Sequence, residues 1–158
     1  MKLTYRQMLD FLNAGLLQPG SDQPIPLLNH VVGTDGLPSE VAVRLRTIRD
    51  EMQKHLGVFA EQRDAILAKY KVRLNEEQQT VEPTDDIADA DEEMKTEATD
   101  RIAKANAELA SLLKVQVEGI RTLRASVLSA ATGPAYQLLV TGRVLDWLWP
   151  VVTDDLPK

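Results

Sequence analysis

The feature that most constrains this chain is a seven-residue repeat of large apolar side chains between residues 39 and 71. Four residues carry the repeat: Leu45, Met52, Phe59 and Ile66. Positions seven apart return to the same face of a helix, so the repeat predicts one long helix. Ser39 directly precedes the periodic segment and is a suitable N-cap.

The neighbouring column of the same helix changes character along its length. Val41 and Ile48 begin it as apolar residues, but His55 and Gln62 continue it as polar ones. A strict two-stranded coiled coil would keep both columns apolar. We therefore expect one member of a helix pair whose contact surface drifts around the helix.

A second long helix is expected over residues 87–114. Its apolar stripe is rich in alanine at the start and in leucine at the end: Ile87, Ala90, Met94, Ala98, Ile102, Ala105, Leu109 and Leu112. Residues 74–86 form a polar connection in which Pro83 disfavours helix before it, and Thr84 or Asp85 can cap the next helix. Two helices with such a connection predict an antiparallel helical hairpin over residues 39–114.

Charge is distributed unevenly along this hairpin. Residues 39–73 hold eight Lys/Arg and five Asp/Glu, a balance of +3, whereas residues 74–100 hold eleven acids and one base, a balance of −10. We therefore expect the basic end of the first helix, with Lys69, Lys71 and Arg73, to lie beside the acidic start of the second. Acidic residues also suit the positive end of a helix dipole.

The remaining residues, 1–38 and 115–158, are expected to form a base for the hairpin within a single domain over residues 1–158. Four parts are predicted there: a helix over 4–17 capped by Thr4, an edge strand or extended segment over 24–32, one or two strands within 115–127, and a closing helix over 134–148. The strands could pair with residues 25–32. The predicted fold class is mainly α with a small β element.

Composition narrows the classes of function. The chain has 158 residues, of which 44% are apolar and 27% charged, values typical of a folded protein. The net charge of −6 disfavours direct binding to nucleic acid, and no apolar run is long enough to cross a bilayer. The first residues lack the apolar core of a signal peptide, so we expect a cytoplasmic protein without a membrane contact.

Little in the sequence points to catalysis. There is no cysteine, and the two histidines, His30 and His55, are best explained as surface or interface residues. The sequence contains no phosphate-binding glycine loop, no nucleophile elbow and no HExxH motif. We therefore predict no catalytic residue, no cofactor and no metal ligand.

The acidic segment is the first candidate for a partner-binding surface. Its residues are Asp85, Asp86, Asp89, Asp91, Glu92 and Glu93. A solvated helix start is the simplest explanation for them. Carboxylates at helical spacing could instead hold a divalent cation, or could imitate the phosphates of a nucleic acid against a basic protein.

Two further clusters are candidates. Trp147 and Trp149 lie in the densest apolar part of the chain, where tryptophan serves either as core or as an anchor for another protein. Five arginines could bind a phosphate or an acidic partner, although pairing with the acids of this chain is the favoured explanation: Arg44, Arg46, Arg49, Arg121 and Arg124.

Two stretches, residues 1–13 and 108–117, resemble a family of small uncharacterised bacteriophage proteins. The first reads MKLTYRQMLDFLN and the second ELASLLKVQV. In that family a short helix precedes a long charged helix that ends near Lys-Tyr, followed by an acidic insert and a second helix. Ala68-Lys69-Tyr70 and the acidic residues 74–100 fit this order. The resemblance implies a gene among phage structural or late genes and carries over no site residue.

These observations predict a non-enzymatic phage protein that acts through protein–protein contacts in virion assembly or as an accessory structural component. The partner would be a phage structural protein or a host protein, with a homo-oligomer as an alternative. The protein would act in the bacterial host cytoplasm or be incorporated in the virion. The second hypothesis is a phage inhibitor of a host enzyme or defence complex, acting through an acidic face that imitates nucleic acid.

Overall fold

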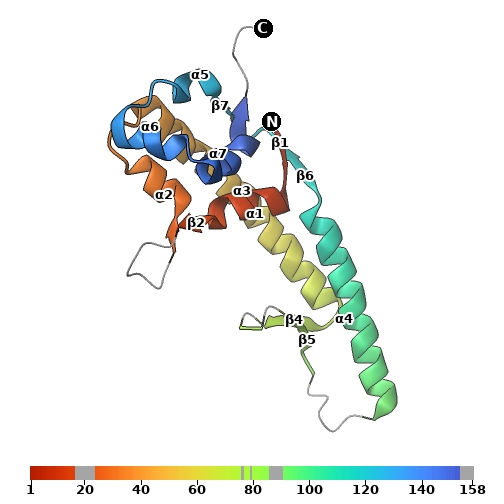
Figure 1. Cartoon of the computed structure of the whole chain (residues 1–158). Coiled ribbons are helices and arrows are strands. Elements are labelled where there is room, and N and C mark those ends of the chain that lie inside the picture. The colour runs from red at the N-terminus through yellow and green to blue at the C-terminus, as the bar shows by residue number, and fades with distance from the viewer. Residues whose placement is uncertain (17–23, 76, 79, 86–90, 154–158) are drawn as a thin grey trace. The chain divides into compact units, whose positions relative to one another are not determined.

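A computed structural model describes residues 1–16, 24–75, 77–78, 80–85 and 91–153 of the chain. The chain divides into two compact units, which are described separately. Unit 1 comprises Met1–Leu56 with Gln116–Lys158, and unit 2 comprises Gly57–Val115. The described residues are mainly helical, which confirms the predicted α-rich class (Figure 1). The single domain with a base of residues 1–38 and 115–158 stays a prediction.

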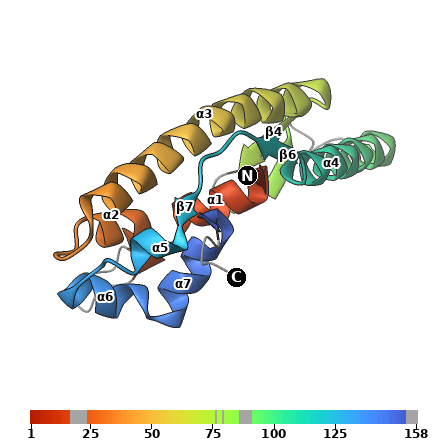
Figure 2. The ribbon, with the colours of Figure 1, turned by 90° about the horizontal axis from the view of Figure 1, so that it is seen from above.

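Unit 1 contains most of the short elements. Its helices are α1 (Tyr5–Asn13), α2 (Leu27–Val32), the first part of α3 (Ser39–Lys69), α5 (Ala125–Leu128), α6 (Gly133–Leu139), α7 (Gly142–Leu148) and the 3-10 turn η1 (Trp149–Val151). Its strands are β1 (Lys2–Thr4), β2 (Gly15–Leu16), β3 (Ile25–Pro26), β6 (Gln116–Glu118), β7 (Leu123–Arg124) and β8 (Val152–Thr153). Viewed from above, α1, α7 and β7 gather alongside the first part of α3 (Figure 2).

The first part of α3 forms the centre of the core of unit 1. Four residues at spacings of three or four are fully buried there: Val41, Leu45, Ile48 and Met52. This spacing places them on one stripe of the helix, as the repeat predicted. Ser39 is the first helical residue, and the carbonyl of Pro38 accepts from the amides of Val41 and Ala42, so the predicted cap is shifted by one position.

Thr4 caps α1 as predicted. The amide of Gln7 donates to Thr4 Oγ1 over 3.2 Å, and the amide of Thr4 donates to Gln7 Oε1 over 2.9 Å, a reciprocal capping box. The helix ends at Asn13 rather than at residue 17, because Gly15 and Leu16 pair as β2 with β3. The expected helix was therefore too long.

The expected strand over 24–32 is mostly a helix. Only Ile25–Pro26 is extended, and α2 follows directly. Leu27, Leu28 and Val31 are buried on one helical face, because Val31 lies four positions after Leu27 and three after Leu28. The short β-branched pair at the end of this segment was a misleading signal.

The expected pairing of residues 115–127 with residues 25–32 is also wrong. β6 pairs antiparallel with β1, where Lys2 faces Glu118 and forms an ion pair with it. β7 pairs parallel with β8. Residues 125–128 form α5 instead of continuing a strand. Strands of two or three residues are chosen by packing far along the chain, which local propensity does not encode.

The predicted closing helix over 134–148 is two helices. α6 ends at Leu139, and α7 begins at Gly142. Between them, Thr141 Oγ1 donates to the carbonyl of Leu138 over 2.7 Å. A threonine that binds local backbone in this way competes with helix propagation, so the break separates two short helices.

Unit 2 contains a β-hairpin where the sequence predicted only a polar connection. β4 (Val72–Asn75) pairs antiparallel with β5 (Thr80–Pro83), and Val72 is buried. Lys71 bends the chain out of α3 with a φ of 52°. Its carbonyl accepts from both the amide and the hydroxyl of Thr84, over 3.1 and 3.0 Å, which closes the open end of the hairpin.

The second long helix, α4 (Glu92–Leu113), begins later than residue 87. Asp91 is its N-cap, with Oδ1 accepting from the amide of Met94 over 2.9 Å, so neither Thr84 nor Asp85 caps it. Residues 87–90 lie outside the described residues. Ala98, Ala105 and Leu112 are buried at seven-residue intervals, and α4 packs against β4 and β5.

The basic end of α3 contacts the later part of α4 instead of its acidic start. Lys69 forms an ion pair with Glu108, and the hydroxyl of Tyr70 donates to the same carboxylate over 2.7 Å. The hydrogen bond from Lys69 has the largest effect on Glu108, followed by the one from Tyr70, and both lower the pKa of the Glu108 carboxyl. In turn, the Glu108 carboxylate raises the pKa of Lys69. Arg73 pairs within the β-hairpin, with Glu82.

Three glycines provide a matched test of the backbone. Gly36 has a φ of +87°, and an added Cβ would meet the carbonyl oxygen of Thr132 at 2.2 Å. Gly119 has a φ of +88° but open space around it, whereas Gly57 lies inside α3 with nothing near. We expect Gly57→Ala to raise the free energy of unfolding by about 0.5–1 kcal/mol, and Gly119→Ala to lower it by about 1–2 kcal/mol. Gly36→Ala should lower it furthest, because backbone must also move.

Urea denaturation followed by circular dichroism measures this order. If Gly36→Ala and Gly119→Ala lowered the free energy of unfolding by the same amount, the result would contradict the close packing of Gly36 against Thr132.

The Glu108 contacts predict a pH dependence of stability in unit 2. A carboxyl whose folded pKa lies below its usual value stabilises the fold above the unfolded pKa and loses that effect as the pH falls through the folded pKa. We expect Glu108→Gln to lower the urea midpoint at neutral pH, and we expect its difference from the unchanged chain to shrink as the pH falls through the folded pKa of Glu108. Glu97→Gln, on the same helix and exposed, is the control. If the urea midpoint of Glu108→Gln stayed below that of the unchanged chain in acid, packing and not charge would be responsible.

Candidate functional site

The acidic candidates have local structural roles wherever the structure describes them. Asp85 Oδ2 accepts from both terminal nitrogens of Arg101, over 3.3 and 3.4 Å. Asp91 caps α4, and Glu92 pairs at 3.8 Å with Lys95 on the next turn.

The other acidic candidates add no shared site. Glu93 is exposed in the first turn of α4, where a negative charge suits the helix dipole. Asp86 and Asp89 lie outside the described residues. In the described part of the chain, no group of three His, Cys, Asp or Glu residues could hold a metal ion. Capping, ion pairing and the helix dipole therefore account for the described acidic candidates.

The two tryptophans occupy opposite environments. Trp147 is buried, and its ring stacks on Phe11 with centroids 4.6 Å apart and an interplanar angle of 14°. Its indole Nε1–H donates to the carbonyl of Phe11 over 2.8 Å. Trp147 is thus a core residue that joins α7 to α1.

Trp149 lies at the surface with 76% of its area exposed, the largest value among the exposed large apolar residues of the described chain. Leu145, one helical turn earlier, is 45% exposed. The backbone of Trp149 is still helical, with φ −48° and ψ −42°, so the two side chains share one face. We call Leu145 and Trp149 the tryptophan surface.

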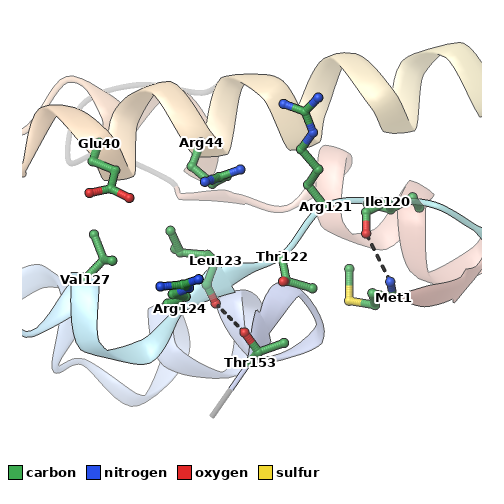
Figure 3. A pocket seen from close by; sticks show the side chains of 10 residues that line it. All are labelled: Met1, Glu40, Arg44, Ile120, Arg121, Thr122, Leu123, Arg124, Val127 and Thr153. Atoms are coloured by element: carbon green, nitrogen blue, oxygen red, sulfur yellow. Dashed lines mark hydrogen bonds between the residues drawn. The ribbon is translucent and has the colours of Figure 1, made fainter. Parts of the chain in front are cut away.

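Five arginines were candidates on the sequence, and three of them lie around one cavity in unit 1. This cavity has a volume of about 460 Å³, and we call it the arginine cavity. Arg44 comes from α3, Arg121 from the chain between β6 and β7, and Arg124 from β7. Figure 3 shows Arg44 and Glu40 directed from α3 toward residues 120–127, with Arg124 on the opposite side. The other lining residues are Met1, Ile120, Thr122, Leu123, Val127 and Thr153.

These three arginines differ in how they are held. Glu51 accepts from Arg121 twice, from Nε over 3.0 Å and from the backbone amide over 2.8 Å. No ion pair is formed by Arg44 or Arg124 with any residue that the structure describes. Pairing within the chain, which the sequence favoured, is therefore seen for Arg121 but not for the other two.

The remaining two arginines lie apart from this cavity. Arg49 pairs with Asp50 and lines a second cavity, and Arg46 is exposed on α3. The sequence alone does not distinguish Arg44 and Arg124 from these two arginines, because the cavity brings together segments that are distant along the chain.

The chain has no match among protein-family models, curated proteins or solved structures. Its resemblance to small phage proteins stays a prediction. Among the described helices, none has the length and apolar character needed to cross a bilayer.

Substitution separates the roles of the two tryptophans. Trp147→Ala should lower the free energy of unfolding by about 3–5 kcal/mol, because a large buried side chain leaves a cavity. Trp149→Ala should change it by at most about 0.5 kcal/mol, as expected for an exposed side chain. Thermal denaturation followed by circular dichroism checks both, and a destabilised Trp149→Ala variant would show that this ring packs against the fold.

Proposed function

We propose that this chain is a non-enzymatic interaction protein that binds another protein through the tryptophan surface. The observation that carries the proposal is the exposure of Trp149 beside buried neighbours. Leu148 is 1% exposed and Val151 is 0% exposed, while Trp149 between them is 76% exposed. A core-packed segment thus presents a large apolar side chain to solvent.

Such a side chain is well suited to binding. Trp is enriched among the residues that contribute most to interface affinity, and it has only two side-chain torsions to order. The buried neighbours hold the backbone in place, and Pro150 restricts it further. Little conformational entropy would be lost when a partner covers the ring, which favours affinity.

The origin and partner are proposed on the resemblance alone. On that basis the chain is encoded by a bacteriophage and binds a phage structural protein or a host protein, in the host cytoplasm or within the virion. A second copy of the chain is the simplest alternative partner. An inhibitor that imitates nucleic acid would use the acidic residues instead, so its complex would weaken steeply with salt.

We also propose that α3 and α4 form the antiparallel helical hairpin of residues 39–114. The contacts of Lys69 and Tyr70 with Glu108 support an association of the two helices, with α4 displaced along α3, since they join the end of α3 to a late turn of α4 and not to its start.

Site-specific cross-linking tests the proposed function. A photoreactive benzoylphenylalanine is placed at position 149, and the matched control carries it at Val43, which is 60% exposed on α3. Each chain is irradiated alone and in extract of the source cells. We expect one discrete cross-linked product from position 149 and none from position 43. An excess of the unchanged chain, which carries no benzoylphenylalanine, should compete for the partner and reduce this product. An excess of the Trp149→Ala chain should not reduce it.

The outcomes distinguish the partners. A product formed by the purified chain alone identifies a second copy, and light scattering then gives the oligomeric mass. Competition by Trp149→Ala equal to that of the unchanged chain would overturn the proposal. Binding that salt abolishes and that Trp149→Ala retains would assign the contact to charged residues.

A further inference from the structure

The described residues that line the arginine cavity carry more positive than negative charge, because Glu40 lines it together with three arginines, of which only Arg121 is ion-paired. The protein has a net charge of −6, and six of its arginines are ion-paired: Arg6, Arg49, Arg63, Arg73, Arg101 and Arg121. Arg44 and Arg124, which face one cavity from different elements, have no such pair among the described residues. Guanidinium groups at one cavity repel each other, and a bound anion would relieve that repulsion.

The arrangement of the guanidinium groups selects the kind of anion. A carboxylate is planar and is satisfied by one guanidinium in a bidentate contact. A phosphoryl group has three terminal oxygens that point in different directions, so it can accept from cations on separate elements. Arg44 on α3 and Arg124 on β7 meet this requirement. Arg121, fixed by Glu51, lines the same cavity.

Glu40 restricts the ligand further. Its carboxylate lines the cavity with Arg44, one helical turn away on α3. A negative group at this position disfavours a ligand that is anionic throughout, but it accepts hydrogen bonds from hydroxyl groups. The walls also include the apolar side chains of Leu123 and Val127. The volume of about 460 Å³ lies within the range of small-molecule sites.

We propose that the arginine cavity binds a small phosphate ester that carries hydroxyl groups. Arg44 and Arg124 bind the phosphoryl oxygens, and Glu40 accepts from a hydroxyl of the ligand. The proposal is independent of protein binding by the tryptophan surface, which uses other residues.

Calorimetric titration of the full chain at constant ionic strength tests the site. The probes are ribose 5-phosphate, inorganic phosphate, ribose and succinate. We expect saturable binding of ribose 5-phosphate, weaker binding of inorganic phosphate and none of ribose. Arg44→Gln and Arg124→Gln should each weaken ribose 5-phosphate binding roughly tenfold or more, the usual effect of losing a charged hydrogen bond. Arg46→Gln, exposed on the same helix outside the cavity, should leave binding unchanged.

Glu40→Gln separates the role of the carboxylate from general electrostatics. Removing this negative charge should tighten the binding of inorganic phosphate. The preference of the cavity for ribose 5-phosphate over inorganic phosphate should then narrow or reverse. Circular dichroism of each variant establishes that the fold is retained.

Three results would overturn the proposal. The first is no saturable binding of ribose 5-phosphate at roughly millimolar concentration. The second is an equal loss of binding in the Arg46 and Arg44 variants, which would show a nonspecific effect of charge. The third is succinate binding as tightly as ribose 5-phosphate, which would assign the cavity to carboxylates.

Discussion

The stack of Trp147 on Phe11 is the contact on which much of unit 1 depends. It joins α7, near the end of the chain, to α1, near its beginning, and the hydrogen bond from the indole to the carbonyl of Phe11 fixes the orientation of the ring. A buried indole without such a partner would be costly. Because Trp147 is fixed, the backbone two residues later is fixed as well. The exposed position of Trp149 is therefore a consequence of core packing.

The first part of α3 plays the corresponding role for the arginine cavity. Its buried stripe, which includes Val41 and Leu45, sets the rotation of the helix. Glu40 and Arg44 each precede one of these residues by a single position, so that rotation also directs them toward the cavity. On the opposite side, buried Leu123 holds the short strand that carries Arg124. Core packing thus positions charged side chains from two distant segments.

The sequence predicted features with a local cause and missed those decided at a distance. The capping box of Thr4 and the buried stripe of α3 follow from spacing within one helix. Phe59 and Ile66 continue the seven-residue repeat but are only half-buried. A repeat predicts which side chains share a helix face, but it does not predict which other elements pack against that face. The strands that contain Lys2 and Glu118 have three residues each, too few for the sequence to indicate which strands pair. The placement of Arg44 and Arg124 at one cavity depends on the fold, because they come from segments far apart in the sequence.

The candidate surfaces differ from the acidic segment in what their side chains already do. Asp85 and Asp91 bind groups of their own chain, so a partner would have to replace contacts that the fold provides. Trp149 stays largely exposed to solvent, and Arg44 and Arg124 form no ion pair with the described residues. A ligand at these positions gains apolar burial or charge pairing without breaking an existing contact. The binding capacity of this chain is therefore expected where a fixed backbone carries an unsatisfied side chain, and not where charge is merely abundant.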